Sequence, residues 1–519
     1  MRKWLPLLTV CLGTFMLLVD VTIVNVALPD MAKDLQTSFG SLQWVIDAYA
    51  LTLAALVLGT GSIADLVGHR HTYVAGLALF AVSSLACGIA PNAAALVAAR
   101  AVQGVGAAAM FATTFALLNS SYTGRERGTA YGMWGAVAGA AAAVGPIIGG
   151  VLTEGFSWRW IFFVNLPVSV VAIALCVLVL SDVHEPVDSS VDIPGMVTFT
   201  AAAAAATYGL IQANEHGWAS AGTWGMLIAA AVLVVVFVRV EMWSRHPMLD
   251  LALMRNRSFV GILIAGLLLT FAAFAALTYT SIWLQSVLGL SPIQAGLTGL
   301  PLSAAAFAVS ALIGRFLHKS HPGPIIGGGL LLIGTGGLLG ALLVHGSASW
   351  VQLVPGLLVI GLGVGLATPT LGSAAMGAVA PQRGGMAAGA VNTARQLGFA
   401  FGIATLGSVF AARAQSALSS EGVANAGRAA RSLAGGQAPV LLHQVPATSR
   451  AALDDALHAA AVAGVQSTFV VAGVLGILGG LLVLVLVRPM SAVGKGAGQS
   501  PAEQQGDAAA AEPARSAAS

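Results

Sequence analysis

Residues 18–29 read LVDVTIVNVALP and place a carboxylate inside a long apolar run. Asp20 is the only charged residue between positions 4 and 28. A transmembrane helix needs about 20 apolar residues, so this run predicts a first membrane span. A charge at such depth costs about 2.5–3.5 kcal/mol on insertion scales and marks a functional site by default. Asp20 is therefore the first candidate residue, and the plainer alternative is an acid tolerated near a helix end.

The composition indicates that the whole chain belongs in a membrane. Of its 519 residues, 57% are hydrophobic and 8% are charged, whereas a soluble domain has about 25% charged residues. The net charge of +3 is too small to indicate nucleic acid as a partner. The three cysteines fall in apolar runs and indicate no disulfide framework. We therefore expect an integral membrane protein with many spans, surrounded by the lipid bilayer.

Fourteen apolar runs are long enough to span a bilayer. They cover residues 4–28, 42–63, 72–90, 93–118, 129–152, 161–181, 192–212, 221–240, 258–284, 292–316, 324–345, 350–376, 386–412 and 464–487. Because no water satisfies an open backbone inside the bilayer, we expect every span to be helical and the fold to be all-α. Residues 489–519 are rich in Ala, Gly, Glu, Gln and Pro without periodicity, which predicts a disordered tail.

The basic residues predict the orientation. Fourteen spans put both termini on one side, and most basic residues then fall on that same side: Arg2, Lys3, Arg70, Arg125, Arg127, Arg239, Arg245, Arg255, Arg257, Arg315, Lys319, Arg383 and Arg488. Short loops on the other side hold only Lys33 and Arg159. Since basic loops stay in the cytoplasm, we expect a multi-pass protein of the cell membrane with both termini cytoplasmic.

Three of the charged residues within the spans fall at a similar depth. At 1.5 Å per residue, Asp20 lies about 12 Å from the outer edge of its span, Arg100 about 10 Å and Asp47 about 8 Å. Charges in such surroundings are neutralised by pairing, so we expect Asp20 to meet Arg100. If the acid alternates between Arg100 and a cavity open to water, its proton affinity changes with conformation. That is the minimum needed to couple protons to transport.

Three further segments combine glycines with charges or proline. Residues 61–71 read GSIADLVGHRH, in which Asp65 and Arg70 can pair; residues 96–108 read LVAARAVQGVGAA, and residues 139–150 read GAAAAVGPIIGG. The residues expected to permit tight turns, close helix contact or a bend are Gly61, Gly68, Gly104, Gly145, Pro146, Gly149 and Gly150. Because Gly- and Ala-rich spans are common in this chain, each segment taken alone also fits simple helix packing.

Together these segments resemble the major facilitator superfamily, and in particular its fourteen-span drug:proton antiporters. LVDVTIVNVALP is similar to that family's first-span signature, GSIADLVGHR to its loop motif, RAVQG to its fourth-span motif and GPIIGG to its antiporter motif. WRWIFFVNLP at 158–167 and NTARQLG at 392–398 resemble family landmarks too. The resemblance implies two six-helix bundles with two inserted helices. The implied domains are 1–181, a linker with two spans at 182–257, and 258–488 with a long outer loop at 413–463, followed by the tail at 489–519.

The resemblance also implies roles for the charged residues. Asp20 is expected to carry the proton and Arg100 to be its basic partner, while Asp65 and Arg70 are expected to latch the cytoplasmic side between the bundles. The glycines and proline at 145–150 are expected to shape the bundle interface and limit leak. Asp47 lies outside the family pattern, and three roles stay open for it: binding a cationic substrate, a second proton site, or a rim acid facing water. The loop motif usually has a basic residue where Leu66 and His69 stand, which weakens its charge latch.

By the same resemblance, the substrate pathway lies between the bundles. Its candidate residues are Asn25, Phe271, Phe274, Thr278, Tyr279, Asn392, Arg395 and Gln396. The aromatic residues of the ninth span roughly share one helical face, and such a stripe more often packs into a core or against lipid than against a ligand. No acid occurs within spans 9 to 14, so a neutral or weakly basic amphipathic drug fits as well as a dication, or better.

The sequence thus predicts proton-driven efflux of a drug or antibiotic by a monomer, with resistance or self-resistance as the result. The alternative is a proton-coupled exporter or importer of another small metabolite. An intramembrane enzyme would need clustered metal ligands in the spans, and ATP drive would need a phosphate-binding loop ending in Gly-Lys-Ser/Thr. The sequence contains neither, so we expect no enzyme activity, no metal and no cofactor.

Overall fold

The computed structural model describes residues 2–37, 39–180, 192–245, 247–313, 321–345, 349–379, 384–443 and 445–487, and every regular element in this part is a helix. Thirteen helices are long and apolar enough to cross a membrane. Each of the fourteen predicted runs coincides with a helix, and α5 (Gly124–Gly155) is the one that falls outside these thirteen. The predicted all-α membrane fold is confirmed. The predicted tail at 489–519 lies outside the described residues.

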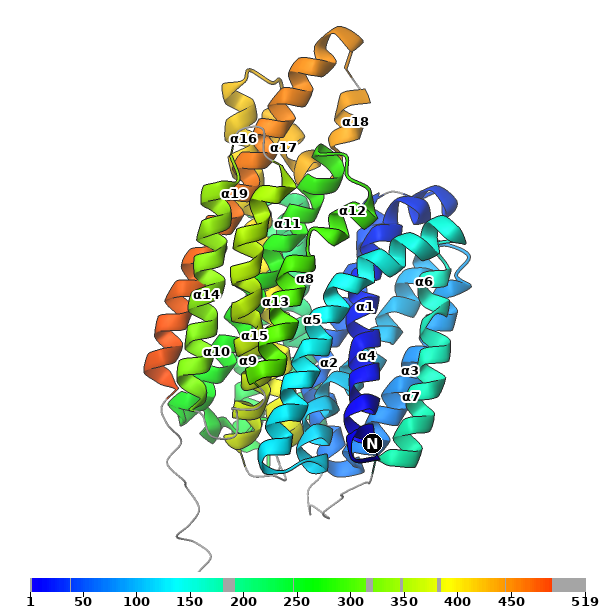
Figure 1. Cartoon of the computed structure of the whole chain (residues 1–519), viewed down its shortest axis with the longest axis vertical. Helices are drawn as coiled ribbons and strands as arrows, with labels where there is room; N and C mark the ends of the chain where they lie inside the picture. Colours follow the sequence, from blue (N-terminus) through cyan, green and yellow to red (C-terminus); the bar gives the residue numbers. More distant parts are fainter. Residues whose placement is uncertain are drawn as a thin grey trace, which may run out of the picture.

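The helices run between two ends of the molecule (Figure 1). We call the end that holds η1 (Arg2–Trp4) the base, and the end that carries α17 (Ala426–Ala434) and α18 (Ala438–His443) the crown. These two names are used below for depth along the helices.

The first bundle is drawn in blue to cyan in Figure 1. Besides α5 it contains α1 (Leu5–Asp34), α2 (Phe39–Val67), α3 (His69–Gly88), α4 (Ala93–Ser121), α6 (Trp160–Phe163) and α7 (Asn165–Val179). Large buried side chains such as Phe80, Phe115 and Trp134 fill its core. Gly68 separates α2 from α3 with φ of 104°, a conformation that favours glycine. Asn92 begins α4, where its side chain accepts a hydrogen bond from Ala95 N at 2.9 Å.

The second bundle begins after η2 (Leu251–Arg255), a short 3₁₀ helix. It contains α10 (Arg257–Thr270), the π-helical η3 (Phe271–Ala275), α11 (Ala276–Ile282), the π-helical η4 (Trp283–Val287), α12 (Pro292–Leu297), α13 (Leu300–Ile313), α14 (Pro322–Leu343), η6 (Trp350–Leu353), α15 (Val354–Gly377), α16 (Gly384–Ser420) and α19 (Ala447–Leu486). Their buried apolar side chains form one continuous cluster. Two π-helical segments therefore interrupt what the sequence suggests is one uniform span.

The segment predicted as a long outer loop at 413–463 is largely helical in the residues that the structure describes. Helix α16 has 37 residues and α19 has 40, so each is about 55–60 Å long. The hydrocarbon core of a bilayer is about 30 Å thick, and both helices therefore extend far beyond it. Together with α17 and α18 they build the crown (Figure 1).

The two bundles meet along two seams. On one side α2 packs against α16, and on the other α5 packs against α13. Helix α8 (Ile193–His216) lies against both α2 and α16, and α9 (Ala221–Trp243) packs on α8. The inserted helices thus cover one seam, and many of the apolar side chains of α9 are exposed at its surface, as expected of a helix that faces lipid.

Candidate functional site

A buried ion pair joins α1 to α4 inside the first bundle. Arg100 Nη1 donates to Asp20 Oδ2 at 2.6 Å, and the two side chains are 1% and 0% exposed. Both residues lie well inside their helices, far from either end. The meeting of Asp20 and Arg100 that the sequence predicts is confirmed, while a role for them in proton coupling stays a prediction.

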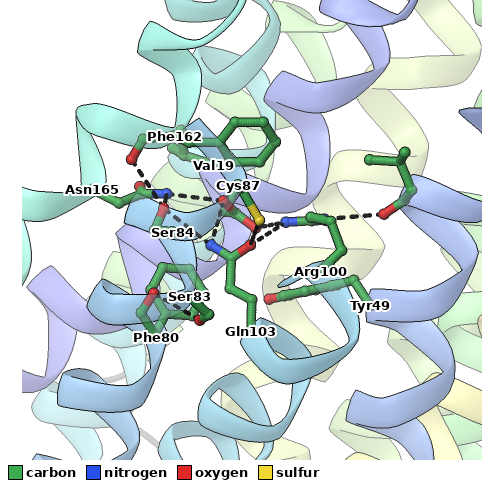
Figure 2. A network of polar contacts seen from close by, with 12 residues as sticks. Val19, Tyr49, Phe80, Ser83, Ser84, Cys87, Arg100, Gln103, Phe162 and Asn165 are labelled. Carbon is green, nitrogen blue, oxygen red and sulfur yellow. Dashed lines mark hydrogen bonds and ion pairs between the residues drawn. The ribbon is translucent and has the colours of Figure 1, made fainter. Parts of the chain in front are cut away.

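Neutral polar side chains complete the surroundings of the carboxylate (Figure 2). Asp20 Oδ1 accepts from Gln103 Nε2 at 3.2 Å and from Asn165 Nδ2 at 2.9 Å. Both amides also donate to Ser84 Oγ, at 3.2 and 3.0 Å, and Ser84 in turn donates to Phe162 O at 2.9 Å. Four helices besides α1, namely α3, α4, α6 and α7, therefore contribute to one closed network around a single carboxylate.

The guanidinium of Arg100 is held on its other sides by α2. Its Nε donates to Val45 O at 3.0 Å, and its carbon lies 4.1 Å from the centre of the Tyr49 ring, in a cation–π contact. Helices α2 and α4 come this close because position 104 is glycine. A Cβ there would lie 1.9 Å from Thr52 Oγ1 and 2.6 Å from Tyr49 O. The predicted close approach at Gly104 is confirmed.

The network can hold a negative charge away from water because each oxygen of the Asp20 carboxylate has a donor. Burial of an ion pair is expensive, and removing one partner of such a pair typically costs about 3–5 kcal/mol. A proton added to Asp20 would abolish the charge that holds Arg100. The arrangement is therefore sensitive to any movement that admits water, and hence a proton, to this carboxylate.

Asp47 lies on a different face of α2 from the residues that hold Arg100. Val45 and Tyr49 both face Arg100, and Asp47 lies two residues from each of them, about 200° away around α2. Its side chain is half-buried on another face of the helix. A similar depth along the spans therefore does not put residues on the same face of the helices.

The acid of the loop motif contacts the second bundle at the base of the molecule. Asp65 Oδ2 accepts from Met386 N, in the first turn of α16, at 3.0 Å, which links the two bundles. Asp65 Oδ1 also lies 3.5 Å from His69 Nε2, and Arg70 Nη2 donates to Val177 O at 2.9 Å within the first bundle. The pairing of Asp65 with Arg70 stays a prediction. Gly68 forms the turn as expected, whereas Gly61 lies inside α2.

The antiporter-like segment of α5 faces both bundles. A Cβ at Gly145 would lie 1.9 Å from Thr22 Oγ1 of α1, and one at Gly150 would lie 2.5 Å from Ile293 Cγ1 of α12. Gly149 is buried. Pro146 falls within α5, and its side chain lies outside the described residues. The predicted close helix contact is confirmed at Gly145 and Gly150, and any role in limiting leak stays a prediction.

Two aromatic residues proposed for the substrate pathway lie in the core of the second bundle. Phe271 is 6% exposed and Tyr279 is 5% exposed. Tyr279 Oη donates to Ile403 O at 2.7 Å, and its ring stacks on Phe410 with centroids 5.6 Å apart. These two residues pack between helices, which is the core position that the sequence offered as the alternative to a ligand-facing stripe. Phe274 is half-buried against the same cluster, and Thr278 is also half-buried.

The three polar residues of α16 lie where the bundles meet. Asn392, Arg395 and Gln396 line a cavity of about 50 Å³, and residues of the first bundle form the rest of its wall: Leu18, Leu53, Val57 and Phe111. Asn392 Nδ2 donates to Phe111 O at 3.0 Å across the interface. Their predicted position on one face of the helix is confirmed. Asn25 belongs to α1, and its side chain lies outside the described residues.

The sequence reasoning missed several members of the network. Gln103 is part of the RAVQG motif, and its position three residues after Arg100 places both on one helical face. Asn165 is part of the WRWIFFVNLP segment. Neither was predicted to contact Asp20. Ser84 and Tyr49 carry no signal in the sequence that would have singled them out.

Two helix bundles that enclose polar groups near the middle of the membrane define the architecture of a secondary transporter. The family model of the Major Facilitator Superfamily matches residues 10–403. The multidrug resistance protein Stp of Mycobacterium tuberculosis is 37% identical over 409 residues, which cover 79% of this chain and 76% of that protein. The chain belongs to the Major Facilitator Superfamily.

Two further relatives are also named as resistance or export proteins. The puromycin resistance protein pur8 of Streptomyces alboniger is 36% identical over 415 residues, covering 79% of this chain and 82% of the relative. The tetracenomycin C resistance and export protein of Streptomyces glaucescens is 32% identical over 416 residues, covering 79% and 77%. Among solved structures, the human organic anion transporter MFSD10 has a TM-score of 0.62 at 15% identity, covering 93% of this chain and 99% of that one, which shows the shared fold.

Proposed function

We propose that this protein exports a drug or antibiotic in exchange for inward-moving protons and so confers resistance. The buried Asp20–Arg100 ion pair is the observation that carries the proposal. Membership of the family and the printed names of its relatives, which are resistance and export proteins, support a drug-like cargo.

Asp20 is the proton carrier in this proposal. When the bundles move and water reaches the network, a proton binds the carboxylate and cancels its charge. Arg100 then loses its anion but keeps Gln103 Oε1 and Val45 O as acceptors. Protonation therefore loosens the bond between α1 and α4 without leaving the guanidinium unpartnered. Loss of this ion pair biases the equilibrium between two arrangements of the bundles.

The cargo passes between the bundles, along the face of α16 that carries Asn392, Arg395 and Gln396. Asn25 of the first bundle remains a candidate for the same pathway. Asp47 remains a candidate for binding a cationic cargo or a second proton. The two bundles act as the moving units, with domain boundaries as the sequence predicts, and Asp65 and the glycines of α5 hold them together when the transporter is closed.

The base faces the cytoplasm in this proposal. Arg2, Lys3, Arg125 and Arg255 all belong to elements at that end, and basic segments remain on the cytoplasmic side. Both termini are then cytoplasmic in the bacterial cell membrane. A single chain supplies both bundles and the cavity between them, so a monomer is sufficient for transport.

Replacement of the proton carrier tests this function. In energised inside-out vesicles, we expect Asp20→Asn to abolish drug-dependent proton release while the protein still inserts at the normal level. Asp34→Asn is the matched control, because it neutralises an exposed acid at the end of the same helix. Control vesicles should release protons as the wild type does. Normal proton-driven efflux by Asp20→Asn would remove Asp20 from the mechanism.

A further inference from the structure

Arg395 differs from Arg100 in having no partner for its charge. Arg100 donates to a carboxylate, an amide and a backbone carbonyl. The guanidinium of Arg395 makes no hydrogen bond or ion pair with any residue in the described ranges, although it lines the cavity between the bundles. An arginine has five donors and no acceptor. A charge at this depth that lacks a partner calls for an anion or for an acceptor oxygen.

The stem of Arg395 is fixed by α10. Thr270 Oγ1 donates to the backbone carbonyl of Arg395 at 2.5 Å. The Arg395 side chain packs beside Gly266, where an added Cβ would lie 3.3 Å from Arg395 Cγ. The backbone and the first part of the Arg395 side chain are therefore held between two packed helices. The planar guanidinium at its end suits bidentate recognition of an oxyanion.

The spans of the second bundle from α10 to α16 cannot supply the missing anion. From Arg257 to Ser420 the chain contains no Asp or Glu at all. In the first bundle, Asp20 is already held by its own network, and the residues that bring the first bundle to the cavity wall are apolar. Among the described residues, the other polar side chains on the wall are the amides of Asn392 and Gln396. The cavity thus offers donors without an acidic acceptor.

We propose that Arg395 binds an anionic oxygen group of the cargo, such as a carboxylate or an enolate, with the Gln396 amide as a second donor. This proposal rests on the proposed export function and specifies the class of its cargo. A cavity of about 50 Å³ holds an acidic group but not a whole drug, so the body of the cargo enters only as the bundles separate. The same chemistry would also accept an inorganic anion, and the experiment must distinguish these two sources.

Binding to the purified full chain in detergent provides the first test. The probes are 1-pyrenebutyrate and its methyl ester, which differ by one charge, and their fluorescence anisotropy reports binding. We expect the acid to bind at least tenfold more tightly than the ester. Arg395→Gln should remove that preference, and Arg395→Lys should keep part of it. Arg413→Gln changes an exposed arginine of the same helix and is the matched control, which should bind as the wild type does.

Three results would overturn the proposal. The first is that the wild type binds the acid no more tightly than the ester. The second is that Arg395→Gln weakens the binding of both probes equally. The third is that replacing gluconate by chloride weakens binding of the acid and that transport requires chloride. The last result would assign the site to an inorganic anion. Proton-driven export of the ester by wild-type vesicles tests the efflux function separately, because that probe carries no charge for Arg395.

Discussion

The Asp20 carboxylate shares its charge with three donors from two other helices, α4 and α7. Besides Arg100, it is held by Gln103 and Asn165, which are themselves fixed by Ser84. Hydrogen bonds of this kind rigidify a buried network when every member is satisfied. All three of these bonds to Asp20 would be lost together if α1 moved relative to α4 and α7, so one carboxylate links local charge to the position of a whole helix.

A second acid on α1 has a different, exposed setting and gives a prediction about pH. Asp34 pairs with Arg159 and accepts from Trp158 Nε1 at 3.0 Å. Hydrogen bonds from Arg159 and then Trp158 hold the pKa of Asp34 below its usual value of 3.8. A lowered pKa in the folded state stabilises the protein at pH values above 3.8, and this contribution is lost as pH falls through the lower, folded value.

We therefore expect Asp34→Asn to lower the melting temperature slightly at pH 7, because an exposed pair contributes little. The difference from the wild type should shrink as pH is lowered below 3.8. Melting temperatures in detergent at a series of pH values measure this. A difference that grows on acidification would contradict the assigned pairing.

What the sequence could predict about the site depended on charge. Asp20 and Arg100 were found because a charge in an apolar run is costly and therefore conspicuous. Ser84 and Asn165 are neutral and cost far less to bury, so only the fold brings them into view. Hydropathy gives the depth of Asp47 but not the face of α2 on which it lies, so the sequence leaves its role open.

At the scale of helices, close approach depends on the absence of a side chain at a few positions. Gly145 lets α5 lie directly against Thr22 of α1, whose hydroxyl donates back to Leu18 O at 3.2 Å and so has a fixed position. Tight helix contact through small residues is a common device in membrane proteins.

Gly145→Ala should therefore lower the free energy of unfolding by about 1–3 kcal/mol, because the new methyl group overlaps the Thr22 hydroxyl. Gly139→Ala on the same helix is the control, since its Cβ would lie 3.4 Å from Ala306 Cβ, an ordinary contact distance. Melting temperatures in detergent compare the two variants. Replacing Thr22 by alanine should partly rescue Gly145→Ala, and no rescue would place the strain elsewhere.

The helices themselves were predictable because long apolar runs have no alternative inside a bilayer. The ends of the helices were not predictable in this way. Helices α16 and α19 continue for several turns past the apolar runs, since Ala-rich segments favour helix in water as well. The π-helical segments at Phe271–Ala275 and Trp283–Val287 also left no mark in the apolar pattern.

For the whole molecule, the contact between Asp65 and α16 is a direct link between the bundles at the base. The carboxylate accepts from Met386 N in the first turn of α16, where the helix dipole also favours negative charge. Apolar side chains from both bundles, including Leu58 and Ala387, pack together near this link.

Loss of this link should expose the interface more often. In a background with Ala387→Cys, we expect Asp65→Ala to increase the rate of labelling by N-ethylmaleimide several-fold, and Asp65→Asn to have a smaller effect because its oxygen can still accept. The native cysteines are buried and add little background. Glu126→Gln removes an acid whose ion pair with Lys3 stays within the first bundle, so its labelling rate should not change. Equal rates in all variants would mean that Asp65 does not restrain the bundles.

Helix α8 covers one of the two seams between the bundles, and this asymmetry affects how an apolar compound can reach the interface from the lipid. It touches α2 and α16 together, so a molecule dissolved in the surrounding lipid meets an additional protein layer on that flank. When the two halves rock, α8 must slide along one of them or travel with the other. If the bundles move as proposed, we expect entry from the bilayer to be easier on the opposite flank, and we expect tethering α8 to both neighbours to slow transport.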